Sequence, residues 1–278
     1  MTTNEKISAL RAAAKDAGGS GVLLMTSDPH SSEYLPAHYN SLTWFSGFTG
    51  ENSTLVVTMT GSALWCDGRF YVQADRQLAG TEIECMHAGS AGVPTVAEYL
   101  TAHFKEGQTL LLDGSCVPAA VAEQYAAALQ KSGAALASRD VVNPLWERLG
   151  DRPALPDTPC RLLTPAQTGA TAADRIALVR GELQKAGATA LAVTGLDCVA
   201  WLTNLRANDL PCTRWPWPAP WSQWTGAPFP GARPPERSGH RHPGRQRRDG
   251  GGLHRPDRRR ARPARRRGVP GGPQNHQL

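Results

Sequence analysis

The stretch STLVVTMTGSALWCDGRFYVQADRQLAGTEIECMH, residues 53–87, indicates the fold class of the chain. Residues 53–60 and 62–68 are two apolar runs on either side of Gly61, which predicts two strands joined by a turn. Residues 69–79 have a helical pattern, and residues 82–87 return to the pattern of a strand. Strands that alternate with helices predict a layered α/β domain.

The same alternation continues on both sides of this stretch. Residues 4–19 predict an alanine-rich helix that ends in glycines, and residues 21–26 predict a buried strand. After residue 87, helices and strands are predicted in turn at residues 95–104, 109–114, 117–133 and 134–139, with Thr95 as a helix cap. We therefore expect a first domain over residues 1–150.

A second unit is expected to follow a connector. Residues 151–170 contain four prolines and predict a linker. Residues 171–213 then begin another α/β unit, with a helix at 171–187, a strand at 188–195 and a short helix within 196–206. By analogy with the first domain a further strand is expected next, but the chain instead reaches TRWPWPAP, residues 213–220.

The charge of the chain is divided unevenly. The whole chain has a net charge of +6, but residues 1–213 carry −6 and residues 214–278 carry +12. Any affinity for nucleic acid predicted from charge therefore rests on the last 65 residues. No apolar run has the length of a membrane span, and the six cysteines form no C-x-x-C pair, which favours reduced thiols. These features predict a soluble cytoplasmic protein.

Candidate chemical groups lie in two of the predicted loops. His30 and Glu33 resemble part of a metal site, but three or more converging ligands are needed and no third is indicated. Cys66 is interpreted as a buried strand thiol rather than a nucleophile, because no histidine is placed to activate it. Asp67 is expected to cap the helix after it, Gly68 to permit the turn, and Arg69 to pair with a carboxylate.

Four motifs together resemble one family. DPHSSEY (28–34), WFSGFTG (44–50), LWCDGRFYVQADRQL (64–78) and VTGLDCVAWLTNLRANDLP (193–211) are similar to the N-terminal half of Xaa-Pro aminopeptidases, also called aminopeptidase P, of the creatinase/prolidase superfamily. The likeness runs from about Ala9 to Thr213. It departs from the family at Ala207, where a glycine is usual, and at GENS, residues 50–53.

The resemblance implies two related α/β domains, each with a mixed sheet between helices, followed by a catalytic domain. That third domain holds two metal ions, usually manganese, through two aspartates, one histidine and two glutamates. The metals supply a hydroxide that attacks the bond before a penultimate proline. No ligand motif of this set has a match here, so no catalytic or metal-binding residue is expected in the chain.

The residues that match family motifs lie in the non-catalytic domains. They are Asp28, His30, Glu33, Tyr34, Trp44, Gly47, Asp67, Gly68, Arg69, Asn204, Arg206 and Asp209. In relatives the first domain can lean over a neighbouring subunit's active site and help form a homodimer. Trp44 and Arg69 are the candidates for such a position, and internal scaffolding is the competing interpretation.

Residues 214–278 have two interpretations. Their 15 arginines, 12 prolines and 10 glycines, without any lysine, predict a disordered segment that could bind nucleic acid through phosphates. The same composition is typical of GC-rich DNA translated in the wrong frame. We favour the second interpretation and expect nucleic acid not to be a partner.

Back-translation of residues 214–226 supports the frame interpretation. When each codon starts one base earlier, every tryptophan codon supplies Leu, Met or Val, and the following residue becomes Ala, Val or Asp. The shifted peptide is an apolar strand that runs into an aspartate turn, which is the element expected next in the second unit. The sequence thus predicts a truncated Xaa-Pro aminopeptidase. The alternatives are a non-catalytic dimerisation or binding domain, and a nucleic-acid binder.

Overall fold

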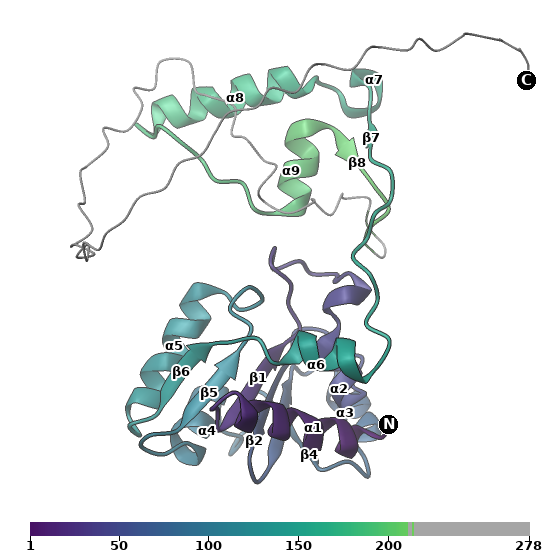
Figure 1. The fold of residues 1–278 in the computed structure, drawn as a ribbon. Coiled ribbons are helices and arrows are strands. Elements are labelled where there is room, and N and C mark those ends of the chain that lie inside the picture. The colour runs from purple at the N-terminus through teal and green to yellow at the C-terminus, as the bar shows by residue number, and fades with distance from the viewer. Residues whose placement is uncertain (211–212, 214–278) are drawn as a thin grey trace, which may run out of the picture. The chain divides into compact units, whose positions relative to one another are not determined.

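The computed structural model describes residues 1–210 and residue 213. The elements of the first domain, in chain order, are α1 (Thr3–Asp16), β1 (Gly21–Met25), η1 (Ala37–Tyr39), α2 (Ser41–Ser46), β2 (Thr54–Thr58), β3 (Ser62–Cys66), α3 (Tyr71–Gln77), β4 (Ile83–His87), α4 (Val96–His103), β5 (Thr109–Leu112), α5 (Ala119–Gln130), β6 (Ala135–Ser138) and α6 (Val142–Leu149) (Figure 1). Every strand and helix predicted within residues 1–150 is present. Helices α2 and α6 are additional.

The first domain is built on a mixed six-stranded sheet with the order β4-β3-β2-β1-β5-β6. Strand β2 is antiparallel to both of its neighbours, whereas β1 with β5, β5 with β6 and β3 with β4 pair in parallel. All strands except β2 therefore point the same way. Their carboxyl ends meet at one edge of the sheet, where ligands commonly bind in open α/β folds.

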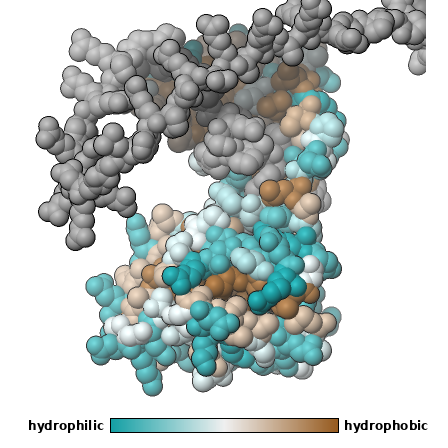
Figure 2. Space-filling view, in the orientation of Figure 1, coloured by the Kyte–Doolittle hydropathy of each residue, from teal (hydrophilic) through white to brown (hydrophobic). Residues whose placement is uncertain are grey.

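Helices cover both faces of this sheet. Alternate residues of each strand belong to two different hydrophobic clusters, as a period of two requires. One cluster joins Leu64 of β3 to Leu10 of α1, Phe45 of α2 and Trp146 of α6. The other joins the central strands to α4 and α5. Figure 2 shows hydrophilic and apolar areas mixed on the face of this domain that is turned to the viewer.

Local sequence explains where the helices begin. Helix α1 starts after Thr2 in a capping box with Glu5, and α4 starts in the same way after Thr95 with Glu98. The predicted cap at Thr95 is therefore confirmed. Helix α2 ends at Gly47, whose backbone is left-handed with φ of 77°, a conformation that glycine adopts without a steric penalty.

The second unit begins within the segment that was expected to be a connector. Its elements are β7 (Arg161–Leu162), α7 (Pro165–Thr168), α8 (Ala172–Lys185), α9 (Leu196–Thr203) and β8 (Leu205–Arg206). The short strands β7 and β8 pair antiparallel, so part of 151–170 is integrated into this unit rather than being a linker. The predicted helices at 171–187 and 196–206 are confirmed.

The predicted strand over residues 188–195 is wrong. These residues have no regular secondary structure. A strand requires a neighbour with which to exchange backbone hydrogen bonds, and within residues 1–210 the only strands of this unit pair with each other. The further strand expected after residue 213, and the expectations for residues 214–278, lie outside the described residues.

Replacing Gly21 with alanine is expected to destabilise the first domain by about 1–3 kcal/mol, as overpacked core substitutions do. An added Cβ would lie 2.7 Å from the carbonyl oxygen of Val57 and 2.8 Å from Cζ of Phe104. The carbonyl oxygen of Val57 lies in the central strand β2, so it cannot move away from the added Cβ. Urea unfolding followed by tryptophan fluorescence measures the change. Gly61→Ala is the matched control, since its nearest neighbour would be 4.0 Å away, and equal midpoints for both variants would contradict the expectation.

Candidate functional site

Most motif residues of the first domain lie in loops at the carboxyl ends of parallel strands, whereas Trp44 and Gly47 belong to α2 and its end. The loop after β1 contains residues 26–34, the loop after β3 contains residues 67–69, and the loop after β5 contains residues 113–116. Because β1, β3 and β5 are parallel to one another, these three loops emerge at the same edge. This edge is the candidate functional site of the chain.

Asp28 organises the first of these loops. Its side chain is buried, and Oδ1 accepts hydrogen bonds from the backbone N–H groups of His30 at 2.8 Å and Ser32 at 3.1 Å. Oδ2 of Asp28 is buried without a hydrogen-bond partner within the described part of the chain. Glu33 is exposed and Tyr34 is half-buried in the same loop. The aspartate of the DPHSSEY motif therefore shapes the backbone.

Asp67 does not cap helix α3 as predicted. The residue that precedes the helix is Phe70, and no side chain caps it. Asp67 Oδ1 instead accepts from the Arg69 backbone N–H at 2.9 Å, and Oδ2 accepts from the Arg69 guanidinium at 2.7 Å. The predicted pairing of Arg69 with a carboxylate is confirmed, and Arg69 holds the pKa of Asp67 at about 2. Asp67 lies three residues before Phe70, the residue at the N-cap position, so its side chain does not cap the free N–H groups of the helix.

Gly68 is not required by the turn in which it lies. Its φ is not in the left-handed region, and an added Cβ would meet nothing closer than 3.9 Å, in the ring of Tyr71. The expectation that Gly68 permits the turn is therefore wrong for this conformation. The turn is held instead by the hydrogen bonds between Asp67 and Arg69.

Trp44 packs against residues of its own chain. The Lys6 ammonium lies 3.9 Å from the ring centroid, and the Trp146 ring stacks at a centroid distance of 5.6 Å. The indole N–H donates to Asp151 Oδ1 at 3.3 Å. Through these contacts Trp44 links its own helix α2 to α1 and α6.

Arg69 lies at an open hollow of about 340 Å³. Its side chain is 62% exposed, although it pairs with Asp67. The hollow also contains Glu33 and Glu51 and the hydroxyls of Ser31 and Ser32. A guanidinium between two carboxylates and several hydroxyls could bind a polar group of a peptide or of another protein surface.

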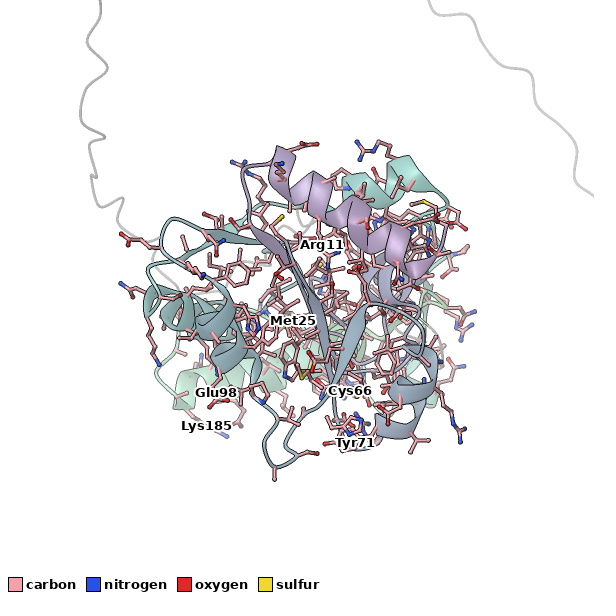
Figure 3. The ribbon with its side chains drawn as sticks, turned by 90° about the horizontal axis from the view of Figure 1, so that it is seen from below. Arg11, Met25, Cys66, Tyr71, Glu98 and Lys185 are labelled. Atoms are coloured by element: carbon pink, nitrogen blue, oxygen red, sulfur yellow. The ribbon has the colours of Figure 1, made fainter. Side chains whose placement is uncertain are left out.

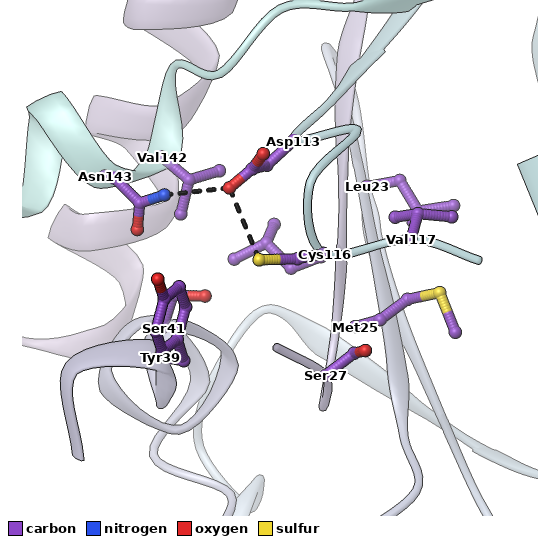
Figure 4. A pocket seen from close by; sticks show the side chains of 11 residues that line it. Leu23, Met25, Ser27, Tyr39, Ser41, Asp113, Cys116, Val117, Val142 and Asn143 are labelled. Atoms are coloured by element: carbon purple, nitrogen blue, oxygen red, sulfur yellow. Dashed lines mark hydrogen bonds between the residues drawn. The ribbon is translucent and has the colours of Figure 1, made fainter. Parts of the chain in front are cut away.

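A smaller cavity of about 20 Å³ lies between the carboxyl ends of β1 and β5 (Figure 4). There Asp113 Oδ2 accepts from Asn143 Nδ2 at 3.0 Å and from the Cys116 thiol at 3.4 Å. Burial raises the pKa of Cys116 to about 12, so the thiol is protonated and not nucleophilic at neutral pH. The space suits about one water molecule and no substrate.

Cys66 is the buried strand thiol that the sequence predicts. Cys66 is 1% exposed, and it belongs to the hydrophobic cluster that α1, α2, α3 and α6 cover. Burial raises the pKa of this thiol, which opposes a role as nucleophile.

The family-motif residues of the second unit form hydrogen bonds within that unit. Asn204 ends α9 in a left-handed conformation with φ of 58°, and its side chain donates to the Ala170 carbonyl at 3.0 Å. Arg206 donates to the carbonyl oxygens of Ala200 and Leu205, both at 2.7 Å. Asp209 accepts from the Thr158 backbone N–H at 3.1 Å. These roles explain the NLR motif and the aspartate after it without any catalytic function.

Arg175 on α8 is a residue that the sequence analysis missed. It is buried and donates to Asn204 Oδ1, to the Trp201 carbonyl, and at 2.7 Å to the Thr168 carbonyl. Its guanidinium also lies 4.9 Å from the centroid of the Trp201 ring. In the sequence Arg175 looks like any charged residue of an amphipathic helix, so no signal there distinguishes it.

An apolar hollow of about 740 Å³ opens beside α8 and α9. Leu191 and Trp201 line it, and they are 57% and 44% exposed. Leu178 on α8 is 60% exposed as well. Side chains of this size are usually covered in a finished domain.

The metal ligands that the resemblance implies do not fit the described residues. Within residues 1–210, the one group of three or more His, Cys, Asp or Glu side chains with converging ligand atoms is Asp75, Cys85 and His87. It does not contain His30 or Glu33, and it is not a set of two aspartates, one histidine and two glutamates. We therefore derive no hydrolytic step from these residues. Within residues 1–210, every helix is also too short or too polar to span a bilayer.

Comparison with known proteins identifies both units. A family model described as Creatinase/Prolidase N-terminal domain matches residues 6–143, and a second model with this description matches residues 151–216. The chain is similar to a probable Xaa-Pro aminopeptidase P of Chaetomium globosum, with 34% identity over 215 residues that cover 76% of this chain and 34% of the relative. It is also similar to Aminopeptidase P2 of Arabidopsis thaliana, with 31% identity over 216 residues that cover 76% of this chain and 30% of the relative.

A solved structure agrees with these relatives. The fold is similar to that of an X-prolyl aminopeptidase from Caenorhabditis elegans, described as a cytosolic enzyme with a di-nuclear active site. The TM-score is 0.70 at 29% identity, and the match covers 76% of this chain and 36% of that one. The chain thus spans about a third of the length of the relatives that it matches. Two creatinase/prolidase N-terminal domains in succession, shared with these enzymes, show that the chain belongs to the aminopeptidase P family, of which it carries the N-terminal part.

Proposed function

We propose that residues 1–210 are the non-catalytic N-terminal part of a Xaa-Pro aminopeptidase. The observation that carries this proposal is the succession of two creatinase/prolidase N-terminal domains over residues 6–143 and 151–216. The complete enzyme would remove the N-terminal residue of a peptide whose second residue is proline. The test is the manganese-dependent release of that residue. It is compared between this chain and the protein encoded when the reading frame is moved by one base near codon 213, which we call the frame-corrected protein.

The other properties of the complete enzyme are proposed on the same basis. It would bind two manganese ions outside residues 1–210, act in the cytoplasm and form a homodimer. The description of the Caenorhabditis elegans protein as a cytosolic enzyme with a di-nuclear site supports the location and the number of metal ions. Manganese and the homodimer rest on the resemblance alone.

We further propose that residues 214–278 are encoded out of frame. The match to the second family model ends at residue 216, near the point at which the composition changes to arginine, proline and glycine. Exposed apolar side chains of the second unit support this proposal, because the apolar side chains of a strand in the shifted frame could cover them. They are Leu178, Leu191 and Trp201.

Arg69 is proposed to contact the substrate or a neighbouring subunit near the active site of the complete enzyme. The open hollow with Glu33 and Glu51 favours it over Trp44, whose ring is engaged with Lys6 and Trp146. This is also the specific observation that favours a binding role for the first domain, the second candidate function.

Arg69→Ala in the frame-corrected protein is expected to lower kcat/KM for an X-Pro peptide about 10- to 100-fold, since hydrogen bonds to charged groups contribute about 1.5–3 kcal/mol. Arg76→Ala is the matched control, because Arg76 lies exposed on α3 and outside the hollow. The measurement is the initial rate of release of the N-terminal residue. Equal kcat/KM values for the two variants would show that Arg69 only shapes its own loop.

A further inference from the structure

A histidine, a cysteine and an aspartate converge at β4, the edge strand of the sheet. The potential ligand atoms of Asp75, Cys85 and His87 all lie within 4.8 Å of one another. Two of these atoms, Asp75 Oδ1 and His87 Nε2, are 2.9 Å apart. Asp75 is exposed, and the other two residues are half-buried. A small ion could therefore reach the cluster from solvent.

The topology brings these three side chains together. Cys85 and His87 are two residues apart on β4, so both project from the same face of the sheet. Helix α3 packs against β4, and it supplies Asp75. The strand pairing places His87 beside Cys66 of β3. The three ligands thus belong to rigid elements rather than to loops.

Neighbouring groups hold the imidazole of His87 in one orientation. The ring of Tyr71 stacks on it with a centroid distance of 4.2 Å and an interplanar angle of 9°. The hydroxyl of Tyr71 donates to the Ala88 carbonyl, which anchors the stacking ring. Figure 3 shows Tyr71 and Cys66 at the same end of the sheet. An imidazole fixed by packing and hydrogen bonding is typical of metal ligands.

The spacing of the three ligand atoms brackets the spacing around a tetrahedral ion. With Zn–S and Zn–N bonds of about 2.3 and 2.0 Å, two ligand atoms of a tetrahedral zinc lie about 3.5 Å apart. To reach this geometry, the Asp75–His87 pair would open by about 0.6 Å, and a pair at the 4.8 Å limit would close by about 1.3 Å. One thiolate, one imidazole and one carboxylate form a ligand set that zinc and cobalt accept and that manganese and magnesium do not favour.

We propose that Asp75, Cys85 and His87 form a site for a divalent transition metal ion of the zinc type. Solvent water completes its coordination. The ion would join α3 to the edge strand β4 and thereby stabilise the first domain. The proposal rests on these three residues of the first domain, so it does not depend on the proposed peptidase function.

Binding must displace the proton of the Cys85 thiol. Burial, and the nearby Cys66 and Asp75, raise the pKa of this thiol to about 12. The titratable groups that face it are Cys66 from β3, Asp75 from α3 and His87 from β4 itself. Metal binding therefore releases this proton.

Titration of the purified 278-residue chain with CoCl₂ tests the site. We expect one equivalent of cobalt to produce a thiolate-to-cobalt charge-transfer band that ZnCl₂ removes by displacement. Cys85→Ser should abolish the band, and Asp75→Asn and His87→Gln should each weaken cobalt binding at least tenfold. The band reports thiolate ligation alone, so binding by the histidines of residues 214–278 does not contribute to it.

Controls separate a site from scattered thiols and from misfolding. Cys160→Ser removes an exposed cysteine elsewhere and should leave the band and the affinity unchanged. ZnCl₂ should raise the thermal midpoint of the unaltered chain and of Cys160→Ser, but not that of Cys85→Ser. Circular dichroism verifies that each variant is folded. If Cys85→Ser does not fold, Asp75→Asn still tests the site, because Asp75 is exposed. Absence of the band, its persistence in folded Cys85→Ser, or unchanged affinity in both Asp75→Asn and His87→Gln would overturn the proposal.

Discussion

The purified 278-residue chain, supplied with MnCl₂, is expected to release no N-terminal residue from a peptide whose second residue is proline. Hydrolysis by a metal-bound hydroxide requires a set of ligands that holds the ions. Within residues 1–210 the one converging group is Asp75, Cys85 and His87, which is not the family's set. Residues 214–278 contain a single glutamate, Glu236, so they cannot supply the two glutamates that the set requires.

Liquid chromatography of an X-Pro tripeptide incubated with the chain measures the release of the N-terminal residue and so tests this expectation directly. The rate with the chain should equal the rate in buffer, with or without manganese, zinc or cobalt. Turnover that depends on added metal, disappears with a chelator and follows the protein through purification would show that the chain contains a catalytic centre. Such a result would also contradict the proposal that its described residues are non-catalytic.

Correcting the frame by one base near codon 213 is expected to convert the inactive chain into an X-Pro aminopeptidase. The corrected frame should begin with an apolar strand and an aspartate turn in place of residues 214–226. It should continue through a catalytic domain with two aspartates, one histidine and two glutamates in the family's order. Its composition should return to about 45–50% apolar residues, as in average globular sequence.

The physical reason for this expectation lies in the second unit. Leu191 and Trp201, which line a hollow of about 740 Å³, are 57% and 44% exposed, and Leu178 on α8 is 60% exposed. Residues 188–195 have the composition of a strand but have no strand beside them among residues 1–210. A strand added after residue 213 would supply backbone partners and cover this apolar surface.

Nucleotide sequencing around codon 213, followed by expression of the corrected gene and the same peptide assay, measures the outcome. The unaltered chain expressed in parallel is the control. A stop codon within a few dozen codons of the corrected frame would exclude the proposal. In that case the binding of residues 214–278 to nucleic acid, with its dependence on salt, becomes the alternative to test.

The secondary structure of the first domain could be read from the sequence because local patterns agree with the fold. Every strand predicted within residues 1–150 is present, as is the cap at Thr95. Helix α2 was missed because six residues are too few to show a helical period. Helix α6 is as long as α4, but it follows Val141, which is not a capping residue type, whereas α4 follows Thr95. The strand at 188–195 was predicted wrongly, because apolar residues indicate a strand whether or not a partner strand exists.

The roles of individual motif residues were less predictable than the elements. Asp67 precedes a helix and has the residue type of a cap, yet it bonds to Arg69 because the helix begins later than expected. Asn204 was recognised from a motif, but its partner Arg175 on α8 could not be. The pairing joins residues 29 positions apart, and no periodicity in the sequence reports such a contact.

By itself the sequence determined the alternation of strands and helices, the family, and the change of character after residue 213, because composition and short-range patterns carry this information. Only the tertiary structure decided which distant side chains meet. Asp75, Cys85 and His87 come from a helix and a strand that are both unremarkable in sequence, and the packing of α3 on the edge strand β4 brings their ligand atoms within 4.8 Å of one another. Such convergence depends on the register and crossing of elements, which long-range packing sets and local pattern does not.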